Sequence, residues 1–340
     1  MRKIQVAHII PAMNLGGVEV GILRSFEILN DKFDYKIYFI KNFGKLDVGQ
    51  ENFIYLILKM FLSKTRPDIV ITSMWWSYPI GLIAKFFGVK WIVFFHSSGF
   101  SSFPEKIFTK LAIKFANSFF YDSFKTKKIL LNGSSKESFH IPYFFLDPFE
   151  NLKLKKDTQF DCIWAGRNSQ EKRLDLVYRI LSDLKNNFPE IKICILIAGK
   201  IHPSLEKLRS DFLNTVNIYY DSHPDFVLKC FEKSKVALCL SDYEGFSMTT
   251  AEAAFSGNLI AARRVGELSS YLPSFETIWL DDTSDESIKR FTSELYFLFE
   301  NKDELFERRK KTHNTSRFYL QRLSYVDSFT NAVNVILEGN

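Results

Sequence analysis

The sequence predicts an α/β protein made of two parallel-sheet domains that follow one another along the chain. Three observations indicate this fold class. With 340 residues, the chain has the length of two ordinary domains. Short apolar runs alternate with longer amphipathic stretches almost throughout, and this alternation pauses once near the middle. Continuous apolar runs are typical of strands buried on both faces, and strands that alternate with helices form β-α-β units.

The first domain is predicted to span residues 1–150. Its strand-like runs lie at residues 4–10, 35–40, 68–72, 91–95, 118–121 and 139–143. Patterns of helical length lie between them, for example at residues 18–29, 78–87 and 105–116. Residues 142–158 contain two prolines and end in a charged stretch, which indicates the linker between the domains.

The second domain is predicted to span residues 151–317 and to begin with a strand at Phe160. Its strand-like runs lie at residues 161–165, 191–198, 216–220, 236–240 and 259–262. A third segment, residues 318–340, reads as a helix from about Phe318 to Leu337. Open parallel sheets bind ligands beyond the carboxyl ends of their strands, so polar residues at those ends are the candidates for function.

Composition places the chain among globular proteins, with 46% apolar and 25% charged residues. The four cysteines form no C-x-x-C pair and three lie in apolar runs, so we expect buried, reduced thiols and neither a metal site nor a disulfide framework. The first apolar run is too short for a signal peptide, and no run approaches the ~18 residues of a membrane span. We therefore expect a cytoplasmic protein.

The net charge of +6 is concentrated in the first half of the chain. Residues 1–150 contain 19 Lys/Arg and 12 Asp/Glu, a net charge of +7, whereas residues 151–340 contain 26 and 27, a net charge of −1. Nucleic acid, an anionic membrane surface or a phosphorylated substrate would each suit this excess. A basic surface with no partner fits equally well.

Residues 104–119 carry a basic amphipathic pattern. Three lysines at i, i+4 and i+8 form one stripe of a helix, and three apolar residues form a neighbouring stripe. The stripes are Lys106, Lys110 and Lys114, and Ile107, Leu111 and Phe115. This pattern is typical of a helix at a membrane surface, possible here on the inner face of the membrane. The alternative is that the apolar stripe packs on the sheet and the lysines remain in solvent.

A glycine pair opens the first predicted helix, within residues 14–19, which read N-L-G-G-V-E. Gly16 and Gly17 allow close backbone approach, and the free amides of a helix N-terminus attract phosphate. The pattern is not the G-x-G-x-x-G of a dinucleotide site, which weakens an oxidoreductase interpretation. A plain tight turn is the alternative.

Two cations follow the first strand of the second domain. Arg167 is placed at the carboxyl end of that strand, and Lys172 near the start of the next helix. Fixed cations at this position suit a diphosphate leaving group. The alternative is a surface loop in which the charges of Glu171, Lys172 and Arg173 are solvated.

The strongest pattern follows the predicted strand at residues 236–240. Glu244 precedes a turn, and Glu252 comes eight residues later on the following helix. A carboxylate at the strand end can accept hydrogen bonds from sugar hydroxyls, and one two turns into the helix can bind a ribose diol. The turn between them presents its amides to phosphate and sugar and consists of Gly245, Phe246, Ser247, Met248 and Thr249. For either Glu alone, a helix-capping charge is the alternative.

These residues resemble the E-x7-E signature of retaining glycosyltransferases with the GT-B fold, in the large family called glycosyl transferases group 1. The pair Gly16 and Gly17 is similar to that family's N-terminal phosphate loop. Arg167 and Lys172 are similar to its diphosphate motif. His96, at the end of the predicted strand 91–95, matches the histidine that faces the donor sugar. The resemblance runs through the whole chain in the family's order.

The resemblance implies two Rossmann-like domains that face each other across a cleft, with the acceptor bound by the first domain and the nucleotide sugar by the second. The final helix would return to the first domain. Glu244 would hold donor sugar hydroxyls, Glu252 the ribose, and Arg167 and Lys172 the departing diphosphate. Gly16 and Gly17 would offer amides to phosphate or acceptor, and His96 would lie beside the reacting sugar.

The implied partners are a nucleotide-diphosphate sugar and a glycan or lipid-linked glycan, as in the synthesis of a surface polysaccharide. We expect no cofactor, no metal and no nucleic acid. The chain departs from the family pattern at Arg173, where glycine is usual, at Asn258, where proline is frequent, and at Glu267, where a second glycine is common. It also carries Tyr143, Phe144 and Phe145 in place of the usual Asn-Gly.

Two other functions fit the same fold. A sugar-nucleotide epimerase acts on the donor alone and needs acid and base groups at the sugar. A non-catalytic partner subunit keeps the fold without the chemistry, although the presence of Glu244, Glu252, Arg167 and Lys172 argues against it.

Overall fold

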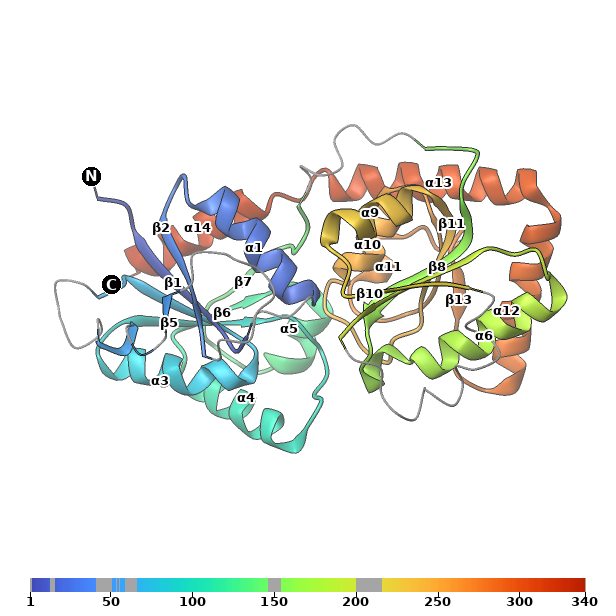
Figure 1. Cartoon of the computed structure of the whole chain (residues 1–340). Helices are drawn as coiled ribbons and strands as arrows, with labels where there is room; N and C mark the ends of the chain where they lie inside the picture. The colour runs from blue at the N-terminus through green and yellow to red at the C-terminus, as the bar shows by residue number, and fades with distance from the viewer. Residues whose placement is uncertain are drawn as a thin grey trace. The chain divides into compact units, whose positions relative to one another are not determined.

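The computed structural model describes residues 2–12, 16–40, 51–52, 54, 56–58, 66–145, 154–199 and 216–339. Residues 14 and 15 of the glycine-containing segment lie outside this part of the chain. The chain divides into two compact units. Unit 1 comprises Met1–Phe145 and Ser324–Asn340, and unit 2 comprises Leu146–Leu323 (Figure 1). Unit 1 is therefore built from two separate stretches of sequence.

Unit 1 contains a parallel sheet of seven strands in the described residues, in the order β3-β2-β1-β4-β5-β6-β7. The strands are β1 (Gln5–Ile10), β2 (Asp34–Phe39), β3 (Glu51–Asn52), β4 (Ile69–Ser73), β5 (Lys90–Phe95), β6 (Ser118–Tyr121) and β7 (Ser138–His140). The helices are α1 (Gly17–Leu29), α3 (Tyr78–Phe86), α4 (Phe103–Phe115), α5 (Phe124–Leu130) and α14 (Tyr325–Glu338), with a 3-10 turn η2 (Trp75–Ser77). Strands β1, β4 and β5 are mostly apolar and almost entirely buried, as is typical of parallel strands with helices on both faces.

Unit 2 contains a second parallel sheet, with six strands among its described residues, in the order β10-β9-β8-β11-β12-β13. Its strands are β8 (Phe160–Arg167), β9 (Ile193–Ala198), β10 (Asn217–Tyr220), β11 (Ser234–Cys239), β12 (Leu259–Arg263) and β13 (Ile278–Leu280). Its helices are η4 (Gln170–Lys172), α6 (Leu174–Asn187), α9 (Pro224–Glu232), α10 (Met248–Phe255), α11 (Leu268–Tyr271), α12 (Asp285–Glu300) and α13 (Lys302–Leu320). In both sheets the first strand is central and the order reverses beside it, at β1/β4 and at β8/β11.

The predicted α/β architecture with two parallel sheets is confirmed, and most predicted strands lie within two residues of the observed ones. The final segment differs from its prediction. In place of one helix from about Phe318, α13 continues to Leu320 and α14 begins at Tyr325 after a break. The side chain of Ser324 accepts a hydrogen bond from the amide of Asp327, which caps α14 and gives it a start of its own.

The linker also begins later than its sequence indicates. Tyr143, Phe144 and Phe145, which the prediction included in the linker, are each at most 3% exposed and belong to unit 1. The rings of Tyr143 and Phe145 pack against Tyr325 of α14, with centroids 5.9 and 4.8 Å apart. Burial of their aromatic rings holds residues 143–145 in unit 1, although they lie beyond β7 and are not part of the sheet.

The four cysteines are buried and unpaired, as predicted. Among the described residues, none of the helices has the length and apolar character needed to cross a bilayer.

Candidate functional site

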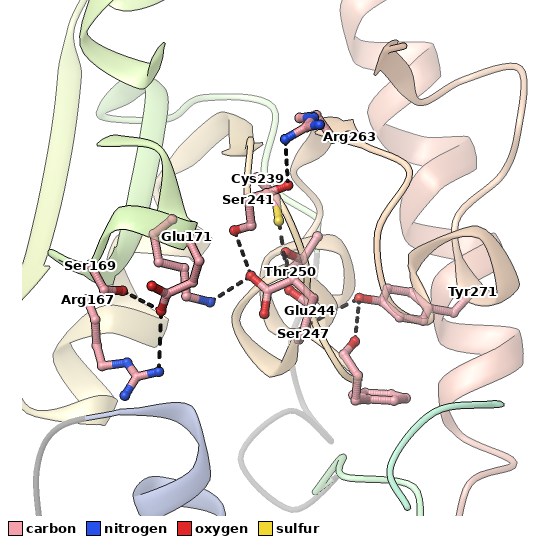
Figure 2. Close-up of polar contacts among 12 residues, drawn as sticks. Arg167, Ser169, Glu171, Cys239, Ser241, Glu244, Ser247, Thr250, Arg263 and Tyr271 are labelled. Carbon is pink, nitrogen blue, oxygen red and sulfur yellow. Dashed lines mark hydrogen bonds and ion pairs between the residues drawn. The ribbon is translucent and has the colours of Figure 1, made fainter. Parts of the chain in front are cut away.

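The centre of the site in unit 2 is an ion pair between the loops that follow β8 and β11. Lys172 Nζ donates to Glu244 Oε1 at 2.6 Å, and Ser241 Oγ donates to the same oxygen at 2.7 Å (Figure 2). The side chains of Lys172 and Glu244 are 20% and 11% exposed. Two residues predicted separately, one for the diphosphate and one for the sugar, are thus in direct contact at the carboxyl ends of adjacent strands.

Arg167 ends β8 and lies beside the same loops. Its Nη2 is 3.7 Å from Oε1 of Glu171, which also accepts a 2.5 Å hydrogen bond from Ser169 Oγ. The backbone amide of Asp242 donates to the carbonyl of Glu171 at 2.8 Å and ties the two loops together. The Arg167 side chain is 46% exposed, so its guanidinium retains open donor positions toward solvent.

The turn after Glu244 is fixed from behind by residues 266–271. The Glu267 amide donates to the carbonyl of Gly245 at 2.9 Å, and Tyr271 OH donates to the carbonyls of Phe246 and Ser247 at 3.2 Å each. Ser247 adopts a left-handed conformation with φ of 59° as it starts α10. Residues other than glycine rarely adopt this backbone conformation, so these hydrogen bonds hold the turn in an otherwise unfavourable shape.

Gly266 makes this bracing possible. Its φ is 54°, and a Cβ placed there would lie 2.0 Å from the carbonyl oxygen of Gly245. No larger residue fits so close to a backbone oxygen. The family difference at the next position, Glu267, leaves this contact intact, because Glu267 contributes through its backbone amide.

A pocket with about 390 Å³ of space, part of it open to solvent, lies at these strand ends. Its polar lining includes Lys172, Ser241, Glu244, Ser247, Thr249 and Thr250. The last three begin α10, whose N-terminus adds partial positive charge and free amides. An ammonium group, a carboxylate, hydroxyls and helix amides around one pocket can bind phosphate and hydroxyl groups together.

Other predicted donor-binding residues lie behind this lining. Phe246, Met248 and Glu252 are 2%, 7% and 6% exposed, and none of them lines the pocket. Phe246 packs on Tyr271 with ring centroids 5.4 Å apart. The Phe246 ring thus supports the turn, and the predicted role of Glu252 at a ribose stays a prediction.

Two departures from the family pattern have local structural reasons. Arg173 occupies a left-handed position with φ of 49°, where glycine would be unstrained. Its guanidinium compensates by binding Asp175 at 3.1 Å and Asp242 at 3.3 Å. Asn258 is fully buried, and its Nδ2 donates to the carbonyls of Phe231 and Ala253 at 2.9 and 3.0 Å. A proline there would leave both carbonyls without these donors.

His96 of unit 1 is held inside a buried polar chain. Its Nε2 lies 2.9 Å from Ser73 Oγ, which lies 2.7 Å from Nε2 of His8, and His8 Nδ1 contacts the hydroxyl of Tyr35. Nδ1 of His96 is 3.9 Å from a carboxylate oxygen of Asp122. The His96 side chain is only 5% exposed, so both ring nitrogens face protein groups.

Burial keeps both histidines neutral. It lowers the pKa of His8 to about 3, and it lowers the pKa of His96 well below its ordinary value, with His8 as a second cause. Gly16 lies at the N-terminus of α1, and the space around Gly17 is open where a side chain would stand. Gly16 and Gly17 are thus placed as predicted at a helix N-terminus, but the prediction that they contact phosphate remains untested.

Sequence reasoning missed Ser241, Tyr271, Ser73 and His8. Ser73 ends β4, and Ser241 follows the end of β11 by two residues, positions that could have marked them. Tyr271 carries no such signal, because it acts on a turn 24 residues away. Among the described residues no group of three or more His, Cys, Asp or Glu could hold a metal ion.

Residues 148–316, which make up nearly all of unit 2, match the family described as Glycosyl transferases group 1. No curated protein sequence matched the chain.

Solved structures show the GT-B fold over the whole chain. Sucrose-phosphate synthase from Thermosynechococcus elongatus is similar with a TM-score of 0.77 at 14% identity, covering 98% of this chain and 99% of the other. HepE from Anabaena, in complex with UDP-glucose, has a TM-score of 0.76 at 14% identity, covering 97% and 98%. A glycosyltransferase from Rickettsia africae has a TM-score of 0.70 at 16% identity, covering 99% of each chain.

Proposed function

We propose that the chain is a retaining glycosyltransferase that moves a sugar from a nucleotide-diphosphate donor to a glycan or lipid-linked glycan, as in surface polysaccharide synthesis. The observation that carries the proposal is the contact between Lys172 and Glu244 at the β8 and β11 strand ends. It lies in the segment that matches the glycosyl transferases group 1 family. The similar HepE structure, which contains UDP-glucose, supports a nucleotide sugar as the donor.

Each polar group has a role in this proposal. Lys172 and Arg167 stabilise the departing diphosphate, with help from the N-terminus of α10, and a metal ion is not needed for this. Glu244 accepts hydrogen bonds from the donor sugar. Ser241 donates to Glu244 and so keeps the carboxylate oriented. Glu252 binds the ribose, and the role of His96 beside the sugar stays a prediction.

The proposed reaction takes place on one face of the sugar. A retaining glycosidase uses a covalent nucleophile from a pair of carboxyl groups about 5–5.5 Å apart. Glu244 is instead neutralised by Lys172, which makes it a poor nucleophile. The leaving diphosphate therefore assists deprotonation of the acceptor hydroxyl, while the protein supplies orientation and charge stabilisation.

The first prediction concerns the central ion pair. Glu244→Ala, Lys172→Ala and Arg167→Ala each remove charge-assisted contacts of about 1.5–3 kcal/mol. Each should lower transfer about tenfold to over a hundredfold while the fold survives. Glu252→Ala should mainly weaken donor binding, because a ribose contact is similar in the ground and transition states. The assay measures transfer from candidate nucleotide sugars in EDTA, after a binding screen has identified the donor.

A second ion pair in unit 2 provides a matched control. Lys235 Nζ and Asp161 Oδ1 are also 2.6 Å apart, with side chains 25% and 20% exposed, near the amino ends of β11 and β8. Lys235→Ala removes a similar pair at the opposite end of the sheet and should leave transfer intact. Equal losses in Lys172→Ala and Lys235→Ala, or a folded Glu244→Ala chain with native turnover, would contradict the proposal.

The two alternatives give different outcomes in the same assay. An epimerase converts the donor into a new sugar nucleotide in the absence of any acceptor. A non-catalytic subunit binds no nucleotide sugar or binds one without turnover.

A further inference from the structure

The outer face of α4 in unit 1 presents apolar and basic side chains together. Phe103, Ile107, Leu111 and Phe115 follow each other at four-residue spacing and are 75%, 43%, 44% and 37% exposed. Lys106, Lys110 and Lys114 are exposed as well. Each lysine precedes an apolar member of the row by one residue, which is about 100° around the helix. The two rows therefore lie next to each other on the outward side.

The inward side of the same helix consists of other residues, among them Phe108 and Ile113, which pack against the core of unit 1. Thr109 and Ala112 are the buried residues of α4, and Phe108 packs against Trp75 at 5.5 Å. An ordinary surface helix buries its largest apolar residues and exposes polar ones. In α4, four large apolar residues remain in solvent while a threonine and an alanine are buried. The sheet below the helix therefore does not account for the apolar row.

The neighbouring helix extends this surface. Helices α3 and α4 pack against each other (Figure 1). On α3, Leu82 and Phe86 stand four residues apart and are 45% and 85% exposed. Contiguous exposed apolar residues on this scale mark interaction sites. We call nine of the exposed residues of α3 and α4 the docking face: Leu82, Phe86, Phe103, Lys106, Ile107, Lys110, Leu111, Lys114 and Phe115.

Helix α4 is firmly fixed at both ends. At its start, Ser102 Oγ accepts from the Glu105 amide, and the carboxylate of Glu105 accepts from the amide of Ser101. At its end, Lys136 Nζ donates to the carbonyls of Lys114 and Ala116 at 2.6 and 2.7 Å. These caps satisfy the free backbone groups of the helix ends. The docking face is therefore a preformed surface.

We propose that the docking face binds an anionic lipid bilayer, with the apolar row entering the interface and the lysines contacting acidic headgroups. Charge complementarity selects this occupant, because the net charge of +7 in residues 1–150 matches an anionic surface. Large apolar side chains beside lysines suit the acyl-headgroup boundary. The inference concerns unit 1 alone, and it would bring the enzyme to a lipid-linked acceptor if the proposed function holds.

Vesicle co-sedimentation of the full chain tests the charge. Binding is expected to vesicles of phosphatidylcholine with phosphatidylglycerol and to fall with salt. Each lysine near an acidic surface strengthens binding about fivefold, so Lys106→Glu, Lys110→Glu and Lys114→Glu together should weaken it on the order of a hundredfold or more. The matched control changes the same charge in unit 2, through Lys289→Glu, Lys302→Glu and Lys310→Glu, and should bind as the native chain does.

A fluorescent probe tests insertion of the apolar row. The four native cysteines are buried, so a Leu111→Cys chain can be labelled selectively with an environment-sensitive dye. Its emission should shift to the blue with anionic vesicles, whereas the same dye on Lys302→Cys should not respond. Phe103→Ser, Ile107→Ser and Leu111→Ser together should weaken vesicle binding about tenfold or more, with an unchanged thermal unfolding profile.

The proposal would be overturned if the chain did not bind anionic vesicles at low salt or bound phosphatidylcholine vesicles equally well. It would also be overturned if the control variant lost as much vesicle binding as the docking-face variant, or if the emission of the dye at Leu111→Cys did not shift. A concentration-dependent dimer that the three serine substitutions abolish would assign the face to a second copy of the chain. Donor binding by each variant, measured without vesicles, keeps a failure here separate from a failure of the proposed function.

Discussion

The six strands of the unit 2 sheet follow the same order as the first six of the unit 1 sheet, but the two sheets place different polar groups where that order reverses. In unit 1, beside β1 and β4, His8, Ser73 and His96 form a buried chain in which both histidines are neutral. In unit 2, beside β8 and β11, Lys172 and Glu244 form an ion pair that borders a pocket. Topology brings polar residues to the same place in both units.

Burial determines what those residues can do. His8 is fully buried, so the cost of desolvation excludes a charge there. Lys172 and Glu244 keep some access to solvent, and their opposite charges are in direct contact. The unit 2 site can therefore respond to a charged ligand, whereas the histidine chain acts as fixed hydrogen-bonding structure.

Acid should produce the largest difference between the units. Burial lowers the pKa of His8 from 6.5 to about 3, so between these values the unfolded chain binds a proton that the folded chain does not. The free energy of unfolding therefore falls as pH falls through this window. One pKa unit corresponds to about 1.36 kcal/mol. Lowering the pH from 7 to 4 should therefore reduce the free energy of unfolding of unit 1 by about 3 kcal/mol through His8 alone. His96 acts in the same direction.

Urea unfolding across this pH range, with hydrogen exchange resolved to β1, β4 and β5, measures the effect. Regional resolution is needed because burial also lowers the pKa of His313 in α13 of unit 2. His8→Gln should be less stable at pH 7 but should show a flatter pH dependence. A native chain whose β1, β4 and β5 protection is the same at pH 7 and pH 4 would contradict the neutral state of His8.

Alanine substitutions at two glycines, one in a turn of each unit, should differ in their effect on stability. Gly133 in unit 1 and Gly266 in unit 2 both have positive φ, at 82° and 54°. A Cβ at Gly133 has nothing within 4 Å, whereas one at Gly266 meets the Gly245 carbonyl. Gly133→Ala should cost about 1 kcal/mol of strain alone, and Gly266→Ala about 3 kcal/mol or more through strain and overlap.

Thermal unfolding and donor titration give the readout for this pair. Gly266→Ala should also weaken donor binding, because the overlap displaces the turn from Glu244 to Ser247. Gly133→Ala should leave donor binding unchanged. Equal effects of the two variants on stability and binding would mean that the bracing by residues 266–271 is unimportant.

The smallest expected effect is at Arg173. Arg173→Gly removes about 1 kcal/mol of left-handed strain but loses partly exposed ion pairs of similar total strength. The net change in unfolding free energy should stay within about 1 kcal/mol. Arg173→Ala keeps the strain and loses the ion pairs, so it should be the less stable variant in chemical denaturation. If Arg173→Ala were more stable than Arg173→Gly, the ion pairs of Arg173 would not compensate for its backbone strain.

The sequence predicted the elements that apolar periodicity governs. Strands such as β5 and β6 are continuous buried runs, and their positions follow directly from the pattern. β13 has only three residues and was missed, because so short a run is not distinct from a loop. The break between α13 and α14 was missed because both sides have helical periodicity.

The candidate site was predicted in its residues but not in its contacts. Lys172 and Glu244 were each identified from their place after a strand, yet they are 72 residues apart and their hydrogen bond depends on sheet order. His8 lies inside an apolar strand and gives no local signal. Its partner Ser73 is 65 residues away, on the strand that pairs with β1 only after the chain has folded.

The divided sequence of unit 1 has a consequence for the order of folding. Phe329 of α14 is fully buried and packs on Phe33, Tyr35 and Phe120 at 5.6 to 6.0 Å. Residues 1–145 leave the ribosome first, but this aromatic cluster stays incomplete until residues 324–339 follow the whole of unit 2. Until α14 has been synthesised, the sheet of unit 1 leaves exposed the apolar side chains that Phe329 covers. Unit 2 can therefore finish folding before unit 1 does.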